Sequence, residues 1–180
     1  MTVFVALLRG VNVGGRTKLA MADLRAAAEG CGYEQVRTYV QSGNVVFSAP
    51  RRPSAAKVAT TLRKAIAAGS TVDPEVVART AAQMEQIVAG NPFADRGATD
   101  TDLHVVFLAD DAKPAGLRDL DLERYAPEEL AVVGHEVYLH LPGGMGRSKL
   151  GADLLRRKDV VGTARNWRSV TTLARMAAET

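Results

Sequence analysis

Residues 36–47, VRTYVQSGNVVF, hold two short strand patterns on either side of a turn. Val36, Thr38 and Val40 alternate with Arg37 and Tyr39, which is typical of a half-buried strand, and the apolar run 45–47 resumes after Ser-Gly-Asn. The segment predicts a strand, a tight turn and a second strand. This pair of strands is the centre of the first module, with one strand and one helix predicted before it and one helix and one strand after it.

The elements on either side complete a ferredoxin-like module. The continuous apolar run at 3–8 predicts a central strand, and apolar steps of three and four at 21–31 predict a helix that Gly32 ends. A second helix spans 53–69, and a strand within 71–79 follows. The resulting order, β-α-β-β-α-β, predicts an antiparallel sheet with two helices on one face.

A second, related module follows a connecting segment. Thr80 and Gln83 form a capping box that begins a short helix, which Asn91-Pro92-Phe93 ends. The next elements predict β-α-β-β-α and a C-terminal helix. We therefore expect an α+β protein with modules at 1–80 and 101–180, joined by residues 81–100. The predicted elements of the second module are a strand at 103–108, a helix at 115–124, a hairpin at 130–141 with its turn at 134–135, a helix after Ser148 and a last helix at 167–178.

Charge is distributed unevenly along the chain. The net charge is +3, but residues 1–68 carry 10 Lys or Arg against 3 Asp or Glu, residues 69–142 carry 5 against 14, and residues 143–180 carry 8 against 3. Two basic segments that fold together would form a positive surface that attracts anions. A codon bias is the alternative explanation, since 17 of the 23 basic residues are Arg and the chain holds 29 Ala.

Composition excludes several classes of protein. Hydrophobic residues at 47% and charged residues at 24% are ordinary globular values. No apolar run approaches the roughly 20 residues of a membrane span, and Met1-Thr2 supplies no basic start for a secretory signal, so we expect a cytosolic protein with no membrane partner. The single cysteine, Cys31, cannot form an internal disulfide, and the three histidines show no metal-ligand spacing. We expect no metal site and assign no cofactor.

The first of four candidate binding loops joins the first strand to the first helix. Residues 9–18, RGVNVGGRTK, could direct backbone N–H groups into one concavity beside a helix N-terminus, where an anion is stabilised. The glycine spacing does not fit the dinucleotide fingerprint. A glycine-rich connection with solvated charges is the alternative. The ligand-binding candidates here are Arg9, Asn12, Gly14, Gly15 and Lys18.

The second loop is the turn at 41–44. Gln41, Ser42 and Asn44 supply hydrogen-bond donors and acceptors, although a plain hairpin turn needs no ligand. In the ferredoxin-like order this turn need not lie beside the first loop.

The third and fourth loops lie near the C-terminus. Residues 143–149, GGMGRSK, precede a helix and resemble a phosphate-binding loop in outline, without the P-loop sequence. Arg147, Ser148 and Lys149 are its candidates, with helix capping as the alternative role of Ser148. In the loop 163–168, Arg165 is the candidate anion ligand, and Asn166 suits both a ligand and the N-cap of the last helix.

A catalytic centre is not indicated. The four loops contain neither a histidine nor a carboxylate that could act as a general acid or base. His104, His135 and His140 fall on predicted strands or a turn, and Cys31 lies in an apolar stripe where it would be a poor nucleophile. We assign no catalytic residue.

Five strings together resemble a known family. They are LLRGVNVGG (7–15), TYVQSGNVVF (38–47), NPF (91–93), GRSKL (146–150) and TARNW (163–167). In this order and spacing they are similar to the signature of the bacterial domain-of-unknown-function family DUF1697, over about residues 3–176, with Val11 where the pattern often has Ile. The resemblance implies a cytosolic α+β protein of this size with no established activity or cofactor.

Three function classes follow from these observations. The leading hypothesis is a site for a phosphate-bearing or otherwise anionic small molecule, with charge from the arginines and lysines of the four loops and orientation from their amides and hydroxyl. The rival is a nucleic-acid-binding module, favoured by a pI near 9.2 but not by an aromatic content of 5%. The third is a protein-interaction unit in which the acidic middle of one copy meets the basic ends of another. The oligomeric state is not predicted.

Overall fold

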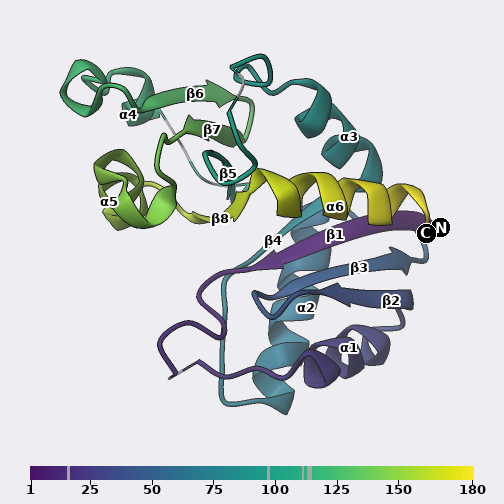
Figure 1. Cartoon of the computed structure of the whole chain (residues 1–180). Coiled ribbons are helices and arrows are strands. Elements are labelled where there is room, and N and C mark those ends of the chain that lie inside the picture. The colour runs from purple at the N-terminus through teal and green to yellow at the C-terminus, as the bar shows by residue number, and fades with distance from the viewer. Residues whose placement is uncertain (16, 97, 111, 113–114) are drawn as a thin grey trace. The chain divides into compact units, whose positions relative to one another are not determined.

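The chain folds into two four-stranded sheets with helices. The computed structural model describes residues 1–15, 17–96, 98–110, 112 and 115–180 (Figure 1). It has the predicted α+β architecture. The elements are β1 (Thr2–Leu8), α1 (Met21–Gly30), β2 (Glu34–Tyr39), β3 (Asn44–Ala49), α2 (Ala55–Gly69), β4 (Val76–Thr80), α3 (Ala81–Ala89), β5 (Leu103–Leu108), α4 (Ala115–Arg118), β6 (Glu129–Val133), β7 (Glu136–His140), α5 (Lys149–Arg156), β8 (Gly162–Asn166) and α6 (Trp167–Ala178), with short 3-10 helices at Glu123–Tyr125 and Met145–Arg147.

The first sheet has the strand order β2-β3-β1-β4, and all its neighbours are antiparallel. This is the ferredoxin-like arrangement expected from the sequence. Helices α1 and α2 cover one face, where Leu24 and Leu62 pack in one cluster with Phe4 and Phe47. The Tyr33 ring stacks on Phe47 with 4.4 Å between ring centroids. The first core therefore lies between this face and the two helices.

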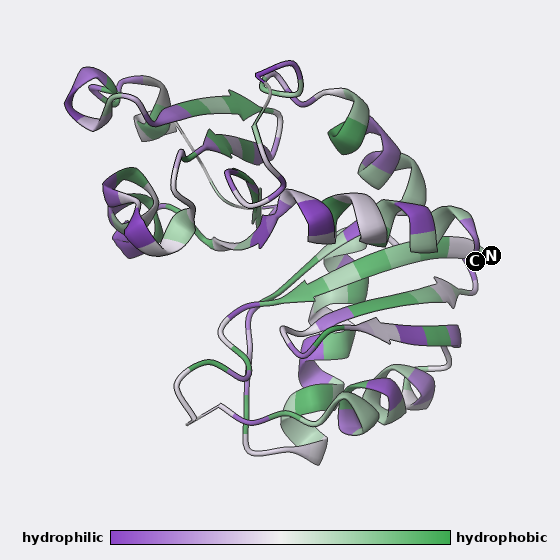
Figure 2. Ribbon diagram, viewed as in Figure 1, coloured by the Kyte–Doolittle hydropathy of each residue, from purple (hydrophilic) through white to green (hydrophobic). Residues whose placement is uncertain are grey.

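The burial of the central strand β1 explains why its sequence is continuously apolar. Residues 4–7 of β1 are all fully buried, although alternate residues of a strand point to opposite faces. Both faces of the sheet are covered at this strand, so the run needs no polar alternation. Figure 2 shows β1 and β3 in the green of hydrophobic residues. At the edge, β2 ends at Tyr39 because Val40 takes a left-handed backbone conformation (φ 47°) and is exposed.

The second sheet has the matching order β6-β7-β5-β8, again with antiparallel neighbours. In both sheets an equivalent pair of backbone hydrogen bonds fixes the end of the central strand. In the first sheet the Leu8 and Arg9 N–H groups donate to Gly43 O (2.8 Å) and Glu75 O (2.9 Å), and in the second the corresponding donors, Leu108 and Ala109, bond to His135 O (3.0 Å) and Val161 O (2.8 Å). The sheets thus share both topology and local bonding, which confirms the two-module prediction.

The strand β8 corrects the prediction for residues 163–168. Sequence analysis placed Thr163–Asn166 in a loop, whereas Gly162–Asn166 is a strand paired with β5. The strand is held by its ladder and by a close backbone approach: a Cβ on Gly162 would lie 2.3 Å from Phe107 O. With β8, the second module is a complete β-α-β-β-α-β.

The prediction of one helix at 115–124 was also wrong. The structure has only the four-residue α4, followed by the 3-10 turn Glu123–Tyr125. Four residues close a single helical turn, so packing of Leu117 and Tyr125 in the second core, rather than a helical ladder, holds this segment.

The chain divides into two compact units. Unit 1 comprises Met1–Gln86 and Thr172–Thr180, and unit 2 comprises Ile87–Thr171. In unit 1 the Arg37 side chain of β2 donates to Met176 O at 2.6 Å, so the C-terminal part of α6 contacts the first sheet. None of the helices in the described ranges combines the length and apolar character needed to cross a bilayer.

Candidate functional site

The Asn12 side chain organises the glycine-rich loop at residues 9–18. Its Oδ1 accepts from the Leu19 N–H (3.0 Å), and its Nδ2 donates to Leu19 O (2.9 Å) and to Gln41 O (2.7 Å). Its own N–H donates to Thr17 O (2.8 Å), and its φ of 57° is tolerated because Asn adopts the left-handed region more readily than most residues. One side chain therefore closes the first loop and ties it to the second.

The turn at 41–44 packs directly on the first loop. A Cβ on Gly43 (φ 76°) would lie 2.5 Å from Val11 Cγ2 and 2.8 Å from Leu8 Cβ, so only glycine fits. The Asn44 side chain is fully buried and donates to Tyr39 O (3.1 Å) and to Ser42 Oγ (3.0 Å). Asn44 therefore shapes the turn, while Gln41 and Ser42 are exposed beside the first loop.

The exposed part of the first loop presents backbone amides and a lysine. Gly14 and Gly15 have φ of 66° and 77°, and their N–H groups make no hydrogen bond within the part of the chain that the structure describes. Thr17 Oγ1 donates to Gly10 O (2.6 Å), which holds the loop closed, and Lys18 is exposed. Arg16 lies outside the described residues. Two amides and one ammonium group are thus available to an anion at this end of the sheet.

A cavity of about 270 Å³ lies beside this loop. One side belongs to the loop, and the other belongs to the segment that connects α2 to β4. The Arg9 N–H donates to Glu75 O, which joins the two sides. The lining residues are Arg9, Gly10, Val11, Thr17, Thr71, Val72, Asp73, Pro74 and Glu75.

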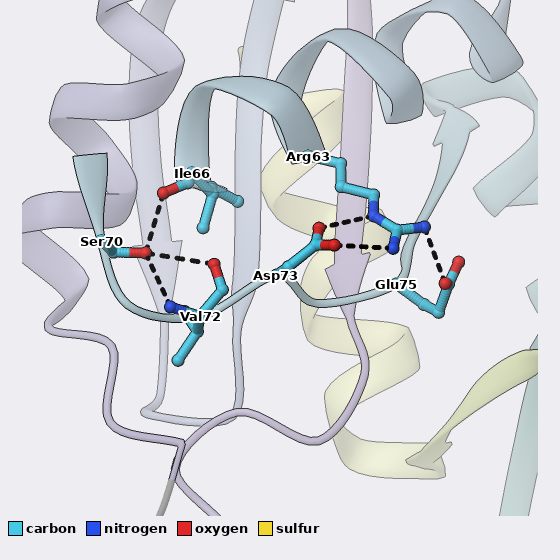
Figure 3. A network of polar contacts seen from close by, with 6 residues as sticks. All are labelled: Arg63, Ile66, Ser70, Val72, Asp73 and Glu75. Carbon is cyan, nitrogen blue, oxygen red and sulfur yellow. Dashed lines mark hydrogen bonds and ion pairs between the residues drawn. The ribbon is translucent and has the colours of Figure 1, made fainter. Parts of the chain in front are cut away.

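Two carboxylates of the cavity lining are held by Arg63 of α2 (Figure 3). The Arg63 guanidinium donates to both oxygens of Asp73 (2.7 and 3.0 Å) and to Glu75 Oε1 (2.7 Å). The hydrogen bonds from Arg63 lower the pKa of Asp73, and those carboxylates raise the pKa of Arg63. Sequence analysis missed Thr71, Asp73 and Glu75, because they belong to no motif and only the fold places them beside Arg9 and Thr17, and it missed Arg63, which pairs with two of them.

Backbone N–H groups at the start of α5, which follows the third predicted loop, already have hydrogen-bond partners within the chain. Ser148 Oγ accepts from the Gly151 N–H (2.7 Å), and Glu128 Oε2 accepts from the Leu150 N–H (2.9 Å). A carboxylate of the chain itself thus stands where an anionic ligand would bind the start of α5. Arg147 and Lys149 are exposed on either side of the buried Ser148.

The fourth predicted segment forms the end of strand β8 and the N-cap of α6. Arg165 lies on β8 and is 8% exposed; its NH1 donates to Thr163 Oγ1 (2.7 Å) and Ala164 O (2.8 Å), and burial lowers its pKa to about 10. Arg79 holds the corresponding place on β4, 3% exposed, and donates to Ala78 O (2.8 Å). Asn166 Oδ1 accepts from the Ser169 N–H (2.9 Å), as expected of an N-cap.

The thirteen candidates are therefore divided between the units. Arg9, Asn12, Gly14, Gly15, Lys18, Gln41, Ser42 and Asn44 belong to unit 1 and lie at one end of its sheet; Arg147, Ser148, Lys149, Arg165 and Asn166 belong to unit 2. Among the described residues, no group of three or more His, Cys, Asp or Glu side chains could hold a metal ion. Burial raises the pKa of the Cys31 thiol, which keeps it protonated.

Two histidines of unit 2 have defined surroundings. His140 Nδ1 lies 3.0 Å from Glu129 Oε2, and Arg96 donates to the other oxygen of that carboxylate at 2.7 Å. His104 on β5 is 9% exposed, its Nδ1 has no partner among the described residues, and burial lowers its pKa. His104 takes the place on β5 that Phe4 takes on β1, so a core aromatic in one sheet is an imidazole in the other.

Comparison with known proteins identifies relatives of unknown function. A family model described as "Protein of unknown function (DUF1697)" matches residues 1–138. The solved structure of the conserved bacterial protein SP0830 from Streptococcus pneumoniae is similar over 98% of each chain, with a TM-score of 0.78 at 21% sequence identity. At that identity the similarity supports the fold alone. No curated protein matches the chain.

Proposed function

We propose that this chain, which belongs to the DUF1697 family, binds a small anionic ligand at the end of its first sheet. The ligand most consistent with the site carries a phosphate group. The binding surface, which we call the loop-1 site, consists of residues 9–15, 17 and 18 together with the cavity that Arg9, Thr17 and Thr71 help to line. A cytosolic location fits such a ligand and the single cysteine of the chain.

The Asn12 hydrogen bonds carry this proposal. A long glycine-rich loop would ordinarily lose much conformational entropy when it is ordered. Here three side-chain bonds of Asn12 hold the loop in place before any ligand arrives, with the Gly14 and Gly15 amides exposed. A preformed group of donors binds an anion without first being ordered, which is the arrangement that favours affinity.

Charge supports the choice of unit and of ligand. Unit 1 holds 12 Lys or Arg against 7 Asp or Glu, a net charge of +5, whereas unit 2 holds 11 against 13, a net charge of −2. Arg9 lines the cavity, and Lys18 stands exposed at the end of the same loop. An anion approaching unit 1 is attracted over the whole surface and bound at the loop.

The nucleic-acid alternative has less support. Ferredoxin-like RNA-binding modules stack bases on aromatic side chains of an open sheet face. In this sheet Val5, Leu7 and Val46 on the face away from α1 and α2 are fully buried, and none of them is aromatic. The strand register places one aromatic residue on that face, Tyr39 on the edge strand β2, and the central strands β1 and β3 offer no aromatic platform there.

Thermal unfolding of the full chain tests the proposal. Inorganic phosphate, sugar phosphates and nucleotides are titrated, and saturation near 100 times Kd should add about 2.7 kcal/mol to the free energy of unfolding. Lys18→Ala should weaken binding roughly tenfold, because a hydrogen bond to a charged group is lost. Lys57→Ala, an exposed lysine of α2, is the matched control and should leave affinity unchanged. If no anion raises the melting temperature, the chain does not have this function.

A single-stranded oligonucleotide in the same assay distinguishes the rival. Binding through several phosphates should weaken steeply with salt, with a slope of about −0.7 per contact. Affinity for an oligonucleotide that exceeds the affinity for every small anion would favour the nucleic-acid hypothesis.

A further inference from the structure

We infer that strand β6 of unit 2 is a docking edge for a second copy of this chain, with the two β6 strands antiparallel and Ala131 at the twofold axis between them. The inference concerns unit 2 alone and does not depend on the loop-1 site.

The register of the second sheet decides which backbone groups of β6 point outward. The Leu108 N–H donates to His135 O (3.0 Å) and the Leu141 N–H donates to Asp102 O (2.7 Å), so the odd-numbered residues of β7 and its flanks direct their backbone groups toward β5. Because this direction alternates along an antiparallel strand, the even-numbered residues of β7 face β6.

Two residues of β6 therefore have backbone groups without a ladder partner. The even-numbered residues of β7 pair with Glu129, Ala131 and Val133, which leaves the N–H and C=O groups of Leu130 and Val132 directed to the outer side. β6 is the outermost strand of its sheet (Figure 1). These four groups form no hydrogen bond with any described residue on that side.

The corresponding edge of the first sheet is protected, and β6 is not. Strand β2 has a register shift between Glu34 and Arg37, and Gln35 within it takes a left-handed conformation (φ 53°). Bulges and charged side chains of this kind prevent an edge strand from pairing with another chain. β6 has a regular register over residues 129–133 and contains no Lys, Arg or Pro.

The only charged residue of β6 is already compensated. Glu129 accepts a hydrogen bond from Arg96 at 2.7 Å on one carboxylate oxygen, and its other oxygen lies 3.0 Å from His140 Nδ1. A strand that docks on this edge therefore meets no uncompensated charge.

The sequence of β6 matches itself when it runs antiparallel about Ala131. Leu130 then lies opposite the partner's Val132, and Val132 lies opposite the partner's Leu130. Each of these pairs exchanges two backbone hydrogen bonds, so all four outward groups of each copy are used. A register shifted by two residues leaves Leu130 or Val132 opposite residues outside the strand. This self-match favours a second copy over an unrelated peptide, and it joins two four-stranded sheets into one.

The side chains agree with the same register. Ala131 faces the partner's Ala131, where two small side chains allow close approach. Val133, which is 47% exposed, faces the partner's Glu129, so like charges do not lie opposite each other. Five residues from each copy form an interface at the small end of the size range, which is typical of transient complexes. We therefore expect a dissociation constant of about 100 μM to 1 mM.

Disulfide trapping tests the register. In a Cys31→Ser background, Ala131→Cys should form a covalent dimer about tenfold faster than Val133→Cys under mild oxidation, because the two thiols at position 131 would lie within disulfide reach. The two thiols at position 133 would be four residues, about 13 Å, apart along the strands. Val133 is the more exposed position, so random collisions would favour Val133→Cys. Equal rates, or a faster Val133→Cys, would overturn the inference.

Sedimentation equilibrium of the full chain tests the dimer itself. Ala131→Lys places two ammonium groups opposite each other and should weaken dimerisation about fivefold or more. Val133→Lys, the matched control, adds the same charge opposite the partner's Glu129 and should not weaken it. Melting temperatures show that both variants are folded. Main-chain pairing should respond little to salt, unlike a contact between acidic and basic segments.

Two results would overturn the inference. One is a wild-type chain that remains monomeric up to about 1 mM, even if it binds an unrelated valine-rich peptide that Ala131→Lys does not bind, since the edge would then serve a peptide partner. The other is a dimer that Ala131→Lys leaves unchanged or that dissociates in salt, since it would form through another surface.

Discussion

Replacing Gly43 by alanine should destabilise the protein through two additive effects. The left-handed backbone at φ 76° costs a residue with a Cβ about 1–2 kcal/mol. The new Cβ would lie 2.5 Å from Val11 Cγ2 and 2.8 Å from Leu8 Cβ, and relieving such overpacking costs typically about 1–3 kcal/mol. We therefore expect Gly43→Ala to lower the free energy of unfolding by about 2–5 kcal/mol in urea denaturation.

Gly15→Ala is the matched control for this change. Gly15 has nearly the same φ, 77°, but a Cβ there would meet nothing within 4 Å. Its cost should be the backbone part alone, about 1–2 kcal/mol. The difference between the two variants measures how tightly the 41–44 turn packs on the first loop. Equal losses, or a neutral Gly43→Ala, would refute this packing.

Three further predictions concern single side chains. Asn12→Ala should lower the free energy of unfolding by about 2–4 kcal/mol in urea denaturation, since three hydrogen bonds of about 1 kcal/mol each are lost. Asn12→Asp keeps the acceptor for the Leu19 N–H but turns a carboxylate oxygen toward Leu19 O and Gln41 O, so it should be no more stable than Asn12→Ala. Arg63 lowers the pKa of Asp73 from its ordinary 3.8, so the stability from this pair is present above pH 3.8 and is lost as the pH falls through the lowered pKa. Arg63→Met should therefore flatten the dependence of the melting temperature on acid pH. If the melting temperature of Arg63→Met depends on pH as that of the wild type does, the pairing is contradicted. Burial lowers the pKa of His104 below its ordinary 6.5, so the unfolded chain binds the proton first and stability is lost as the pH falls below 6.5. His104→Phe, which introduces the aromatic ring found at Phe4, should remove that loss and raise the free energy of unfolding at pH 7 by about 1 kcal/mol. A variant that is less stable than wild type both at pH 7 and below pH 6.5 would contradict this prediction.

Local signals were sufficient for most of the elements. The caps at Thr80, Ser148 and Asn166 each bond to a backbone N–H three residues ahead, so the chain near each helix start contains the whole interaction. The apolar run 3–8, of which residues 4–8 are buried, and the hairpin predicted at 130–141 and found at 129–140 are likewise continuous patterns. These features depend on neighbours in the sequence, and they were predicted correctly.

Elements and contacts that depend on distant partners were not predicted. Strand β8 lacks an apolar pattern, with Gly162, Thr163 and Arg165 among its five residues, and becomes a strand only through pairing with β5. Arg165 was expected to face an anion, yet the strand carries it into a buried position where its own neighbours accept its hydrogen bonds. A charge pattern cannot show whether a side chain is exposed.

The loop residues near the N-terminus were identified by sequence because glycine and asparagine are favoured where the backbone turns left-handed, a preference local to each residue. Their neighbours were not identified, because Asp73 and Glu75 come beside Arg9 only when β4 pairs with β1. Backbone conformation is determined by the residue and its neighbours, whereas the composition of a cavity is determined by strand pairing across the whole module, and that pairing exists only in the folded chain.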